Sequence, residues 1–352
     1  MNAPRRIPWA RAGDFVQIRT EAEILATLDP SGRLEGLSFM PEMRAYCGTT
    51  LPVFRRAEKT CVSHLGISRM KDAVLLSGAR CDGSAHGNCD AGCLFFWKDQ
   101  WVKPLPRGNG HPTGRERLSL EGGADTPLAV QREHDGTAAE QGAPATETFS
   151  CQATDLLTAT TPLAPWDPRQ YVRDVSSGNF AVAHVAPVLA SRLAGRARRT
   201  SRRAIARMRS RAGAEEAQTA SLPGAADPGI AATPERSARG IPSEIQPGDR
   251  VMVRSQTEIE ATLDSRGMNR GLAFRSEMLL YCGREFHVVK RVNRIIDERS
   301  GRMLHLRDCL VLDGIVCEAS YHRFCPRAAY LYWREAWLVK LSSSLDTGAS
   351  ET

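Results

Sequence analysis

The chain has 352 residues, 42% of them hydrophobic, and a formal net charge of +7. No apolar run approaches the ~20 residues of a membrane-spanning helix, and the N-terminus lacks the apolar stretch of a secretory signal. We therefore expect a cytoplasmic protein of about two or three domains with no transmembrane segment. In that compartment its ten cysteines would serve as ligands, reactive groups or core residues rather than as disulfides.

An internal duplication organises the chain. Residues 13–48 and 248–283 align without a gap and share 19 identities in 36 positions, far more than chance allows. The match resumes downstream after a shift of one residue, and two homologous domains are predicted at 8–106 and 245–343. The aligned downstream pairs are Cys81 with Cys317, His86 with His322, Cys89 with Cys325, Trp97 with Trp333, and Trp101 with Trp337.

Each copy has the same order of predicted elements. In the first copy, residues 15–19 alternate as a strand does, and a short helix is expected to begin at the hydroxyl cap Thr20. Glycine-rich turns, a helix ending in Tyr-Cys-Gly, a hairpin joining 51–61 to 73–81 and an aromatic-rich strand follow. About five short strands in under about a hundred residues predict a mainly β, α+β fold, with two tandem small SH3-like barrels.

The end of each copy has the spacing Cys-x4-His-x2-Cys, which supplies three of the four ligands that a tetrahedral Zn²⁺ needs. The first copy offers Cys61 or Cys93 as the fourth ligand, and the second copy offers Cys309. Cys61 in the first copy and Cys309 in the second would lie on opposite strands of the equivalent hairpin, where side chains of facing strands are neighbours. We therefore hypothesise that the fourth ligand changed strands between the two copies while the metal stayed in place. The two predicted sites are Cys309, Cys317, His322 and Cys325, and Cys61, Cys81 and Cys89 with Cys93 or His86.

Other interpretations of these cysteines stay open. They could be buried structural thiols, or Cys61 and Cys93 could form a redox or disulfide pair. An iron–sulfur cluster in the first copy is less consistent with the sequence than zinc, because the second copy lacks two of the four cysteines. A Cys-His-acid trio of Cys81, His86 and Asp82 would suggest a thiol enzyme, but neighbours on one loop rarely form such a relay. The sequence therefore favours a non-enzymatic protein.

Four tryptophans in the last strands are expected mainly to close the barrels. Alternatively, some of them line an exposed aromatic groove for an extended peptide. These residues are Trp97, Trp101, Trp333 and Trp337.

The middle of the chain differs in composition from both copies. Residues 107–147 are rich in Gly, Ala, Pro, Thr and Glu, which is typical of a flexible, partly disordered linker. Residues 148–190 are predicted to be an ordered segment that docks on a barrel. Residues 191–244 are predicted to be an arginine-rich arm followed by a second flexible linker.

Nine arginines and no acidic residue lie between Arg192 and Arg211. Such a run could bind a nucleic-acid backbone or an anionic membrane surface, or it could be a solvated linker that only maintains solubility. The predicted anion-binding residues are Arg196, Arg198, Arg199, Arg202, Arg203 and Arg207.

The motifs ATLD…EM..YCG, RCDGSAHGNCDAGC..FWK, WDPRQYVRDVSSGN and VCEASYHRFCPRA…YWREAWL resemble a family of bacterial proteins for which no activity is established. The resemblance implies the same two-copy architecture and says little about function. We expect a non-enzymatic, zinc-stabilised tandem binding or adaptor protein whose partner is a protein or peptide. The alternatives are a thiol- or metal-dependent enzyme or maturation factor that uses the first-copy cysteines, and nucleic-acid or anionic-surface binding through the arginine-rich arm.

Overall fold

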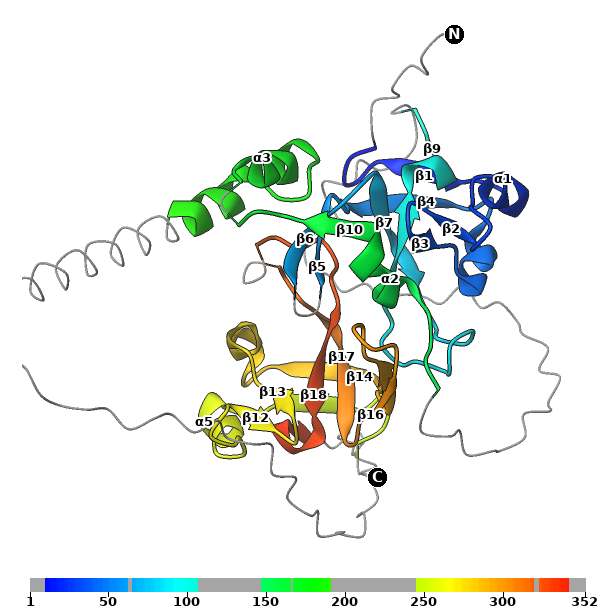
Figure 1. Cartoon of the computed structure of the whole chain (residues 1–352). Helices are drawn as coiled ribbons and strands as arrows, with labels where there is room; N and C mark the ends of the chain where they lie inside the picture. The colour runs from blue at the N-terminus through cyan, green and yellow to red at the C-terminus, as the bar shows by residue number, and fades with distance from the viewer. Residues whose placement is uncertain are drawn as a thin grey trace, which may run out of the picture. The chain divides into compact units, whose positions relative to one another are not determined.

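The computed structural model shows a mainly β protein with few helices (Figure 1). The described residues up to Phe180 and from Ile245 onward belong to one compact unit, and residues 181–190, helical from 182, belong to a second. The structure describes residues 10–62, 65–106, 147–165, 167–190, 245–319 and 323–341.

Two five-stranded antiparallel sheets form two half-barrels with the same strand order. In the first half-barrel the order is β8-β7-β4-β1-β9, so the last strand pairs with the first. In the second half-barrel the order is β18-β17-β14-β11-β19. The strands are β1 (Phe15–Ile18), β4 (Thr50–Arg56), β7 (Ala73–Arg80), β8 (Leu94–Lys98), β9 (Val102–Pro104), β11 (Arg250–Val253), β14 (Glu285–Arg291), β17 (Cys309–Val316), β18 (Tyr330–Arg334) and β19 (Leu338–Lys340).

Short helices connect the strands where the sequence predicts them. Helix α1 (Glu21–Leu25) begins at Thr20, whose side chain and that of Glu23 cap each other's backbone N–H groups. Helix α5 (Gln256–Glu260) begins at Ser255 in the same way. The predicted helices that end in Tyr-Cys-Gly are 3-10 helices, η1 (Pro41–Tyr46) and η3 (Ser276–Tyr281). The remaining short elements are β2 (Arg33–Leu34), β3 (Leu37–Ser38), η2 (Asp99–Trp101), β12 (Met268–Asn269), β13 (Leu272–Ala273) and η5 (Glu335–Trp337).

The chain between β4 and β7 forms a separate hairpin, which the sequence analysis did not predict. The Ala57 N–H donates a hydrogen bond to the carbonyl of Ala73, at the end of the β4–β7 pairing. The chain between these two residues forms β5 (Lys59–Val62) and β6 (Gly66–Met70). Cys61 consequently faces Ile67 on β6 rather than a residue of β7, so the hypothesis that its ligand role moved across the β4–β7 ladder is wrong. The second half-barrel has a corresponding hairpin, β15 (Arg294–Ile296) and β16 (Met303–His305).

The segment after residue 147 packs on the first half-barrel. It comprises α2 (Gln152–Ala159), β10 (Thr160–Pro162) and α3 (Arg169–Ser176), and β10 pairs with β6. The Gln152 side chain accepts a hydrogen bond from the Phe96 N–H and donates to the carbonyl of Ser38, so it ties α2 to β8 and β3.

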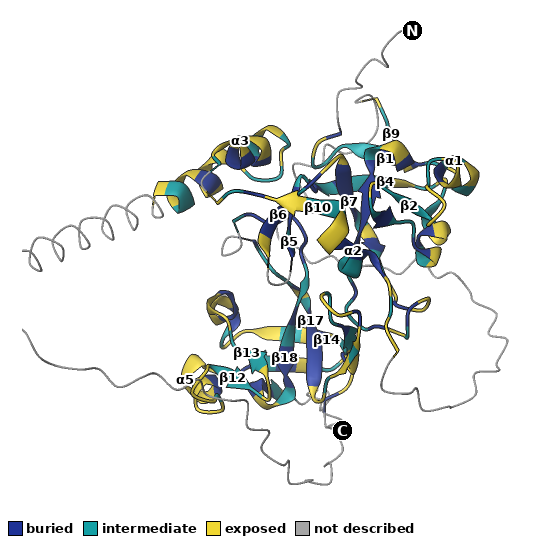
Figure 2. Ribbon diagram, viewed as in Figure 1, coloured by how far each residue is buried: buried dark blue, intermediate teal, exposed yellow. Residues whose placement is uncertain are grey.

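The four tryptophans, two on strands β8 and β18 and two on the 3-10 helices η2 and η5, lie in the cores and have no exposed surface. The alternative of an exposed groove built from Trp97, Trp101, Trp333 and Trp337 is therefore wrong. Strands β7 and β17 are buried along most of their length (Figure 2). Within the part of the chain that the structure describes, no helix is long and apolar enough to span a membrane.

Candidate metal centre

Three ligand-type side chains converge at the end of strand β7. Glu42 lies on η1, Cys81 directly follows β7, and His86 lies in the loop that leads to β8. This loop folds back because Gly83 has a φ of +77°, and a Cβ at that position would lie 2.1 Å from the carbonyl oxygen of Cys89. Only glycine fits there, and the close approach brings Cys89 beside the other three residues.

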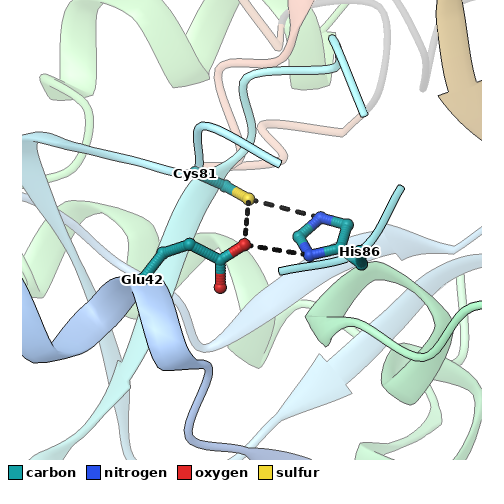
Figure 3. A group of neighbouring side chains, drawn as sticks. All are labelled: Glu42, Cys81 and His86. Atoms are coloured by element: carbon teal, nitrogen blue, oxygen red, sulfur yellow. Dashed lines mark hydrogen bonds and ion pairs between the residues drawn. The ribbon is translucent and has the colours of Figure 1, made fainter. Parts of the chain in front are cut away.

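The three side chains form a closed triangle (Figure 3). Cys81 Sγ lies 3.4 Å from His86 Nε2 and 4.0 Å from Glu42 Oε1, and His86 Nδ1 lies 3.0 Å from the same Glu42 oxygen. Bonds of ~2.0–2.3 Å in a tetrahedron place zinc ligand atoms roughly 3.3–3.8 Å from each other. Cys81 and Glu42 contact different nitrogens of His86, and the three distances bracket this range, so the group could bind a metal ion through a thiolate, a carboxylate oxygen and one imidazole nitrogen.

Burial makes these groups costly without a cation. The side chains of Glu42 and His86 are each only 4% exposed. Among the described residues, Glu42 Oε2 is buried and makes no hydrogen bond. Buried polar atoms are nearly always bonded, so this oxygen fits a role as a metal ligand.

Cys89 contacts the triangle through His86. It is 6% exposed and its thiol lies within hydrogen-bonding reach of His86. The sulfur atoms of Cys81 and Cys89 each accept a hydrogen bond from the backbone N–H two residues further on, that of Gly83 at 3.3 Å and that of Ala91. Such N–H donors stabilise a thiolate.

The electrostatics of the cluster favour a positive charge at its centre. Burial opposes a charged His86, but hydrogen bonds to Cys81, Cys89 and Glu42 outweigh it and raise the pKa of His86 to about 12. Burial also raises the pKa of Cys89, yet the hydrogen bonds from His86 and from backbone N–H groups lower it overall. For Cys81 burial prevails and the pKa is raised. The pKa values of Glu42 and Cys89 are both lowered, so these two groups favour negative charge, as ligands of a divalent cation do.

The structure thus brings together three residues of the predicted first site, Cys81, His86 and Cys89. Glu42 was not among the predicted ligands, although its counterpart Glu277 stands in the same duplicated Glu-Met…Tyr-Cys-Gly motif. Cys93 does not belong to the cluster, and its sulfur instead accepts a long contact of 3.9 Å from Arg327.

Cys61 lies against the second half-barrel, where its backbone N–H donates to Cys325 Sγ at 3.1 Å. All ten cysteines, Cys61 and Cys93 included, are free thiols, so the alternative of a disulfide between these two is absent from the structure.

The predicted second site is rearranged. Cys309 begins β17 and Cys317 follows its end, so roughly 25 Å of strand separates them at ~3.3 Å per residue. Cys309 Sγ instead accepts a hydrogen bond of 3.3 Å from Arg334. The structure therefore does not bring Cys309 to Cys317. His322 and the six predicted anion-binding arginines lie outside the described residues.

A cavity of about 620 Å³ borders the cluster. Its walls include Cys81, His86 and Cys89 of the first half-barrel and Glu277 and Cys317 of the second. The fold and the site together define a mainly β protein of two half-barrels in which a group of described residues, Glu42, Cys81 and His86, could bind a metal. No protein-family model, curated protein sequence or solved structure matches the chain.

Proposed function

We propose that the chain is a non-enzymatic binding protein whose first half-barrel is stabilised by a structural Zn²⁺. The ligands are Glu42, Cys81, His86 and Cys89. The observation that supports this most strongly is the closed triangle of Glu42, Cys81 and His86, in which each side chain contacts the other two. Four protein donors, of which only Cys81 is partly exposed, would leave no open coordination position, which is typical of structural rather than catalytic zinc.

The architecture agrees with a binding module that needs a stabilising ion. Each sheet is a meander whose last strand follows a 3-10 turn and pairs with the first strand, as in small SH3-like barrels, and we propose that identity for both half-barrels. Domains of this size bury a limited core, so an ion that ties η1 to the loop after β7 adds stability that the core alone does not supply.

A protein or peptide partner is proposed for the cavity. Its volume of about 620 Å³ is within the range of ligand sites. Ile295, Leu304 and Tyr330 line it, and Leu304 is 45% exposed. Peptides selected by phage display on the full chain are expected to carry apolar anchor residues and to lose at least tenfold in affinity for the L304D variant. Selected peptides that bind both forms equally would exclude the cavity as the binding site.

A thiol enzyme is the competing function, because Cys81, His86 and Glu42 are also the residue types of a nucleophile, a base and an orienting acid. In such a relay the acid contacts the histidine on the side away from the nucleophile. Glu42 and Cys81 do contact opposite nitrogens of His86, but the same Glu42 oxygen is also only 4.0 Å from Cys81 Sγ. Burial, and then the nearby Glu42 charge, raise the pKa of Cys81. An activated thiol has a lowered pKa, so the geometry favours ligation.

Metal content and thiol reactivity test the proposal. The full chain, purified without a metal-chelating column, is expected to lose one zinc equivalent in C81S and to bind zinc more weakly in E42Q. The C47S variant, a matched control at a partly buried cysteine outside the cluster, is expected to keep its zinc. Cys81 should resist iodoacetamide until a chelator is added. Equal zinc in C81S and wild type, with fast alkylation of Cys81 in both presence and absence of chelator, would favour the enzyme.

A further inference from the structure

A second group of metal-ligating side chains lies where β5 contacts the second half-barrel. The backbone N–H of Cys61 donates to Cys325 Sγ at 3.1 Å, and the two thiols are themselves in hydrogen-bonding contact. The Glu277 carboxylate on η3 contacts the thiol of Cys317, and Cys61 is near enough for its charge to act on Cys317. Three thiols and one carboxylate therefore lie near one another as two contacting pairs, Cys61 with Cys325 and Glu277 with Cys317.

Three members of this group stand at the same aligned positions as ligands of the first centre. The two centres thus arise from the same places in the two copies. The aligned pairs are Glu277 with Glu42, Cys317 with Cys81, and Cys325 with Cys89.

The local hydrogen bonds are also the same. The sulfur of Cys317 accepts from the backbone N–H of Ala319, and that of Cys325 accepts from the backbone N–H of Arg327. Both cysteines of the first centre accept a backbone N–H two residues on in the same manner. The loop of the second half-barrel is therefore built to hold its two sulfur atoms as the first loop holds its own.

The hairpins explain where an additional ligand comes from. Cys89 accepts a hydrogen bond from the N–H of Ile296 on β15, whereas Cys325 accepts one from the N–H of Cys61 on β5. Ile296 and Cys61 occupy aligned positions, so each hairpin reaches the centre of the other half-barrel. At the first centre the hairpin presents an isoleucine, and at the second it presents a thiol.

We infer that Cys61, Cys317, Cys325 and Glu277 bind a second Zn²⁺, which links the first half-barrel to the second. Thiolate-rich sites select zinc among the common divalent ions. Glu277 and Cys325 are 3% and 2% exposed, as befits a closed structural site. The guanidinium of Arg55 lies near enough for the charges of Cys325 and Cys317 to act on it, and it offsets the negative charge of the ligands. His322 lies outside the described residues and takes no part in this inference.

Zinc stoichiometry distinguishes this second site from the centre in the proposed function. The inference rests on the proposed function only in treating both clusters as metal centres. The wild-type full chain is expected to hold two zinc ions. C317S and C61S are each expected to hold one, C81S one, and the doubly substituted C81S/C317S none. C309S is the control at a cysteine remote from both sites and should retain two. Two zinc ions in C317S would overturn the second site. If only C81S loses a zinc ion, the second site is wrong and the proposal for the first centre still holds.

Alkylation of the wild-type chain covers the case in which a variant fails to fold. Cys61 is partly exposed, so without a ligand role it should react with iodoacetamide at the same rate with and without a chelator. We expect peptide mass spectrometry to show at least tenfold faster alkylation of Cys61, Cys317 and Cys325 after chelation. An unchanged rate at Cys61, or retention of two zinc ions by C61S, would remove Cys61 from the site and overturn the link between the half-barrels.

Discussion

Lys59 on β5 donates a 2.6 Å hydrogen bond to the carboxylate of Asp174 on α3, and the two side chains are 3% and 4% exposed. The ammonium also lies 5.1 Å from the ring centroid of Tyr171. This buried pair fastens the middle segment to the same strand that carries Cys61. It therefore connects the docking of α3 with the position of the second metal centre.

Replacement of Lys59 by methionine should be strongly destabilising at pH 7.5. K59M leaves the Asp174 carboxylate buried without its countercharge, and breaking a buried pair in this way costs about 3–5 kcal/mol. Chemical denaturation of the full chain measures the loss. The control is R173M, because Arg173 pairs with Glu58 at 3.6 Å on the surface and such exposed pairs contribute at most about 1 kcal/mol. An equal effect of the two substitutions would contradict the prediction.

The effect of K59M should also depend on pH. Burial outweighs the attraction of Lys59 and raises the pKa of Asp174 to about 6 in the folded wild type. The stability contributed by the protonated carboxyl is therefore present below its ordinary pKa of about 4 and is lost as the pH rises through about 6. Without Lys59 the pKa of Asp174 rises further. The Asp174 carboxyl of folded K59M therefore keeps its proton to higher pH, and the variant continues to lose stability as the pH rises there.

The free energy of unfolding, measured from pH 5 to pH 8, tests this sign. The difference between wild type and K59M is expected to be smallest below pH 6 and to grow above it. A difference that shrinks as the pH rises would show that Asp174 is not the group left unpaired. R173M should track the wild type over the whole range.

The cores of the two half-barrels should respond alike to loss of one hydroxyl. Trp101 Nε1 donates to Thr27 Oγ1 at 3.0 Å, and Trp337 Nε1 donates to Thr262 Oγ1 at 2.9 Å. T27V or T262V leaves a buried indole N–H unpaired, which costs about 1–3 kcal/mol. T27S and T262S keep the hydroxyl and should cost less than the valine variants. Thermal unfolding measures the four variants, and a valine variant as stable as its serine counterpart would contradict the argument.

Local patterns in the sequence predicted the local parts of the structure. The strand at Phe15 and the cap at Thr20 depend on alternation and on a hydroxyl before a helix, and both are found. Cys81, His86 and Cys89 lie within one loop, so their spacing was sufficient to group them.

Residues that meet across long separations could not be found from spacing. Glu42 approaches Cys81 from 39 residues upstream, and its carboxylate on a 3-10 helix looks like any surface acid in the sequence. Cys61 and Cys325 are 264 residues apart and belong to different copies. Alignment of the copies treats each as self-contained, so it conceals a hairpin of one copy that contacts the other.

Gly83 provides the most direct test of how the first centre is built. Its φ of +77° and the 2.1 Å approach of a Cβ to the carbonyl oxygen of Cys89 mean that alanine cannot be accommodated without moving backbone. G83A is therefore expected to displace Cys89 and to lose one zinc equivalent, as measured by elemental analysis. The control is G32A, because Gly32 has a similar φ of +75° but nothing within 4 Å of its Cβ position. G32A should cost only the left-handed backbone strain of about 1–2 kcal/mol and retain all its zinc. Equal zinc in the two variants would show that the close contact between Gly83 and Cys89 does not position the ligands.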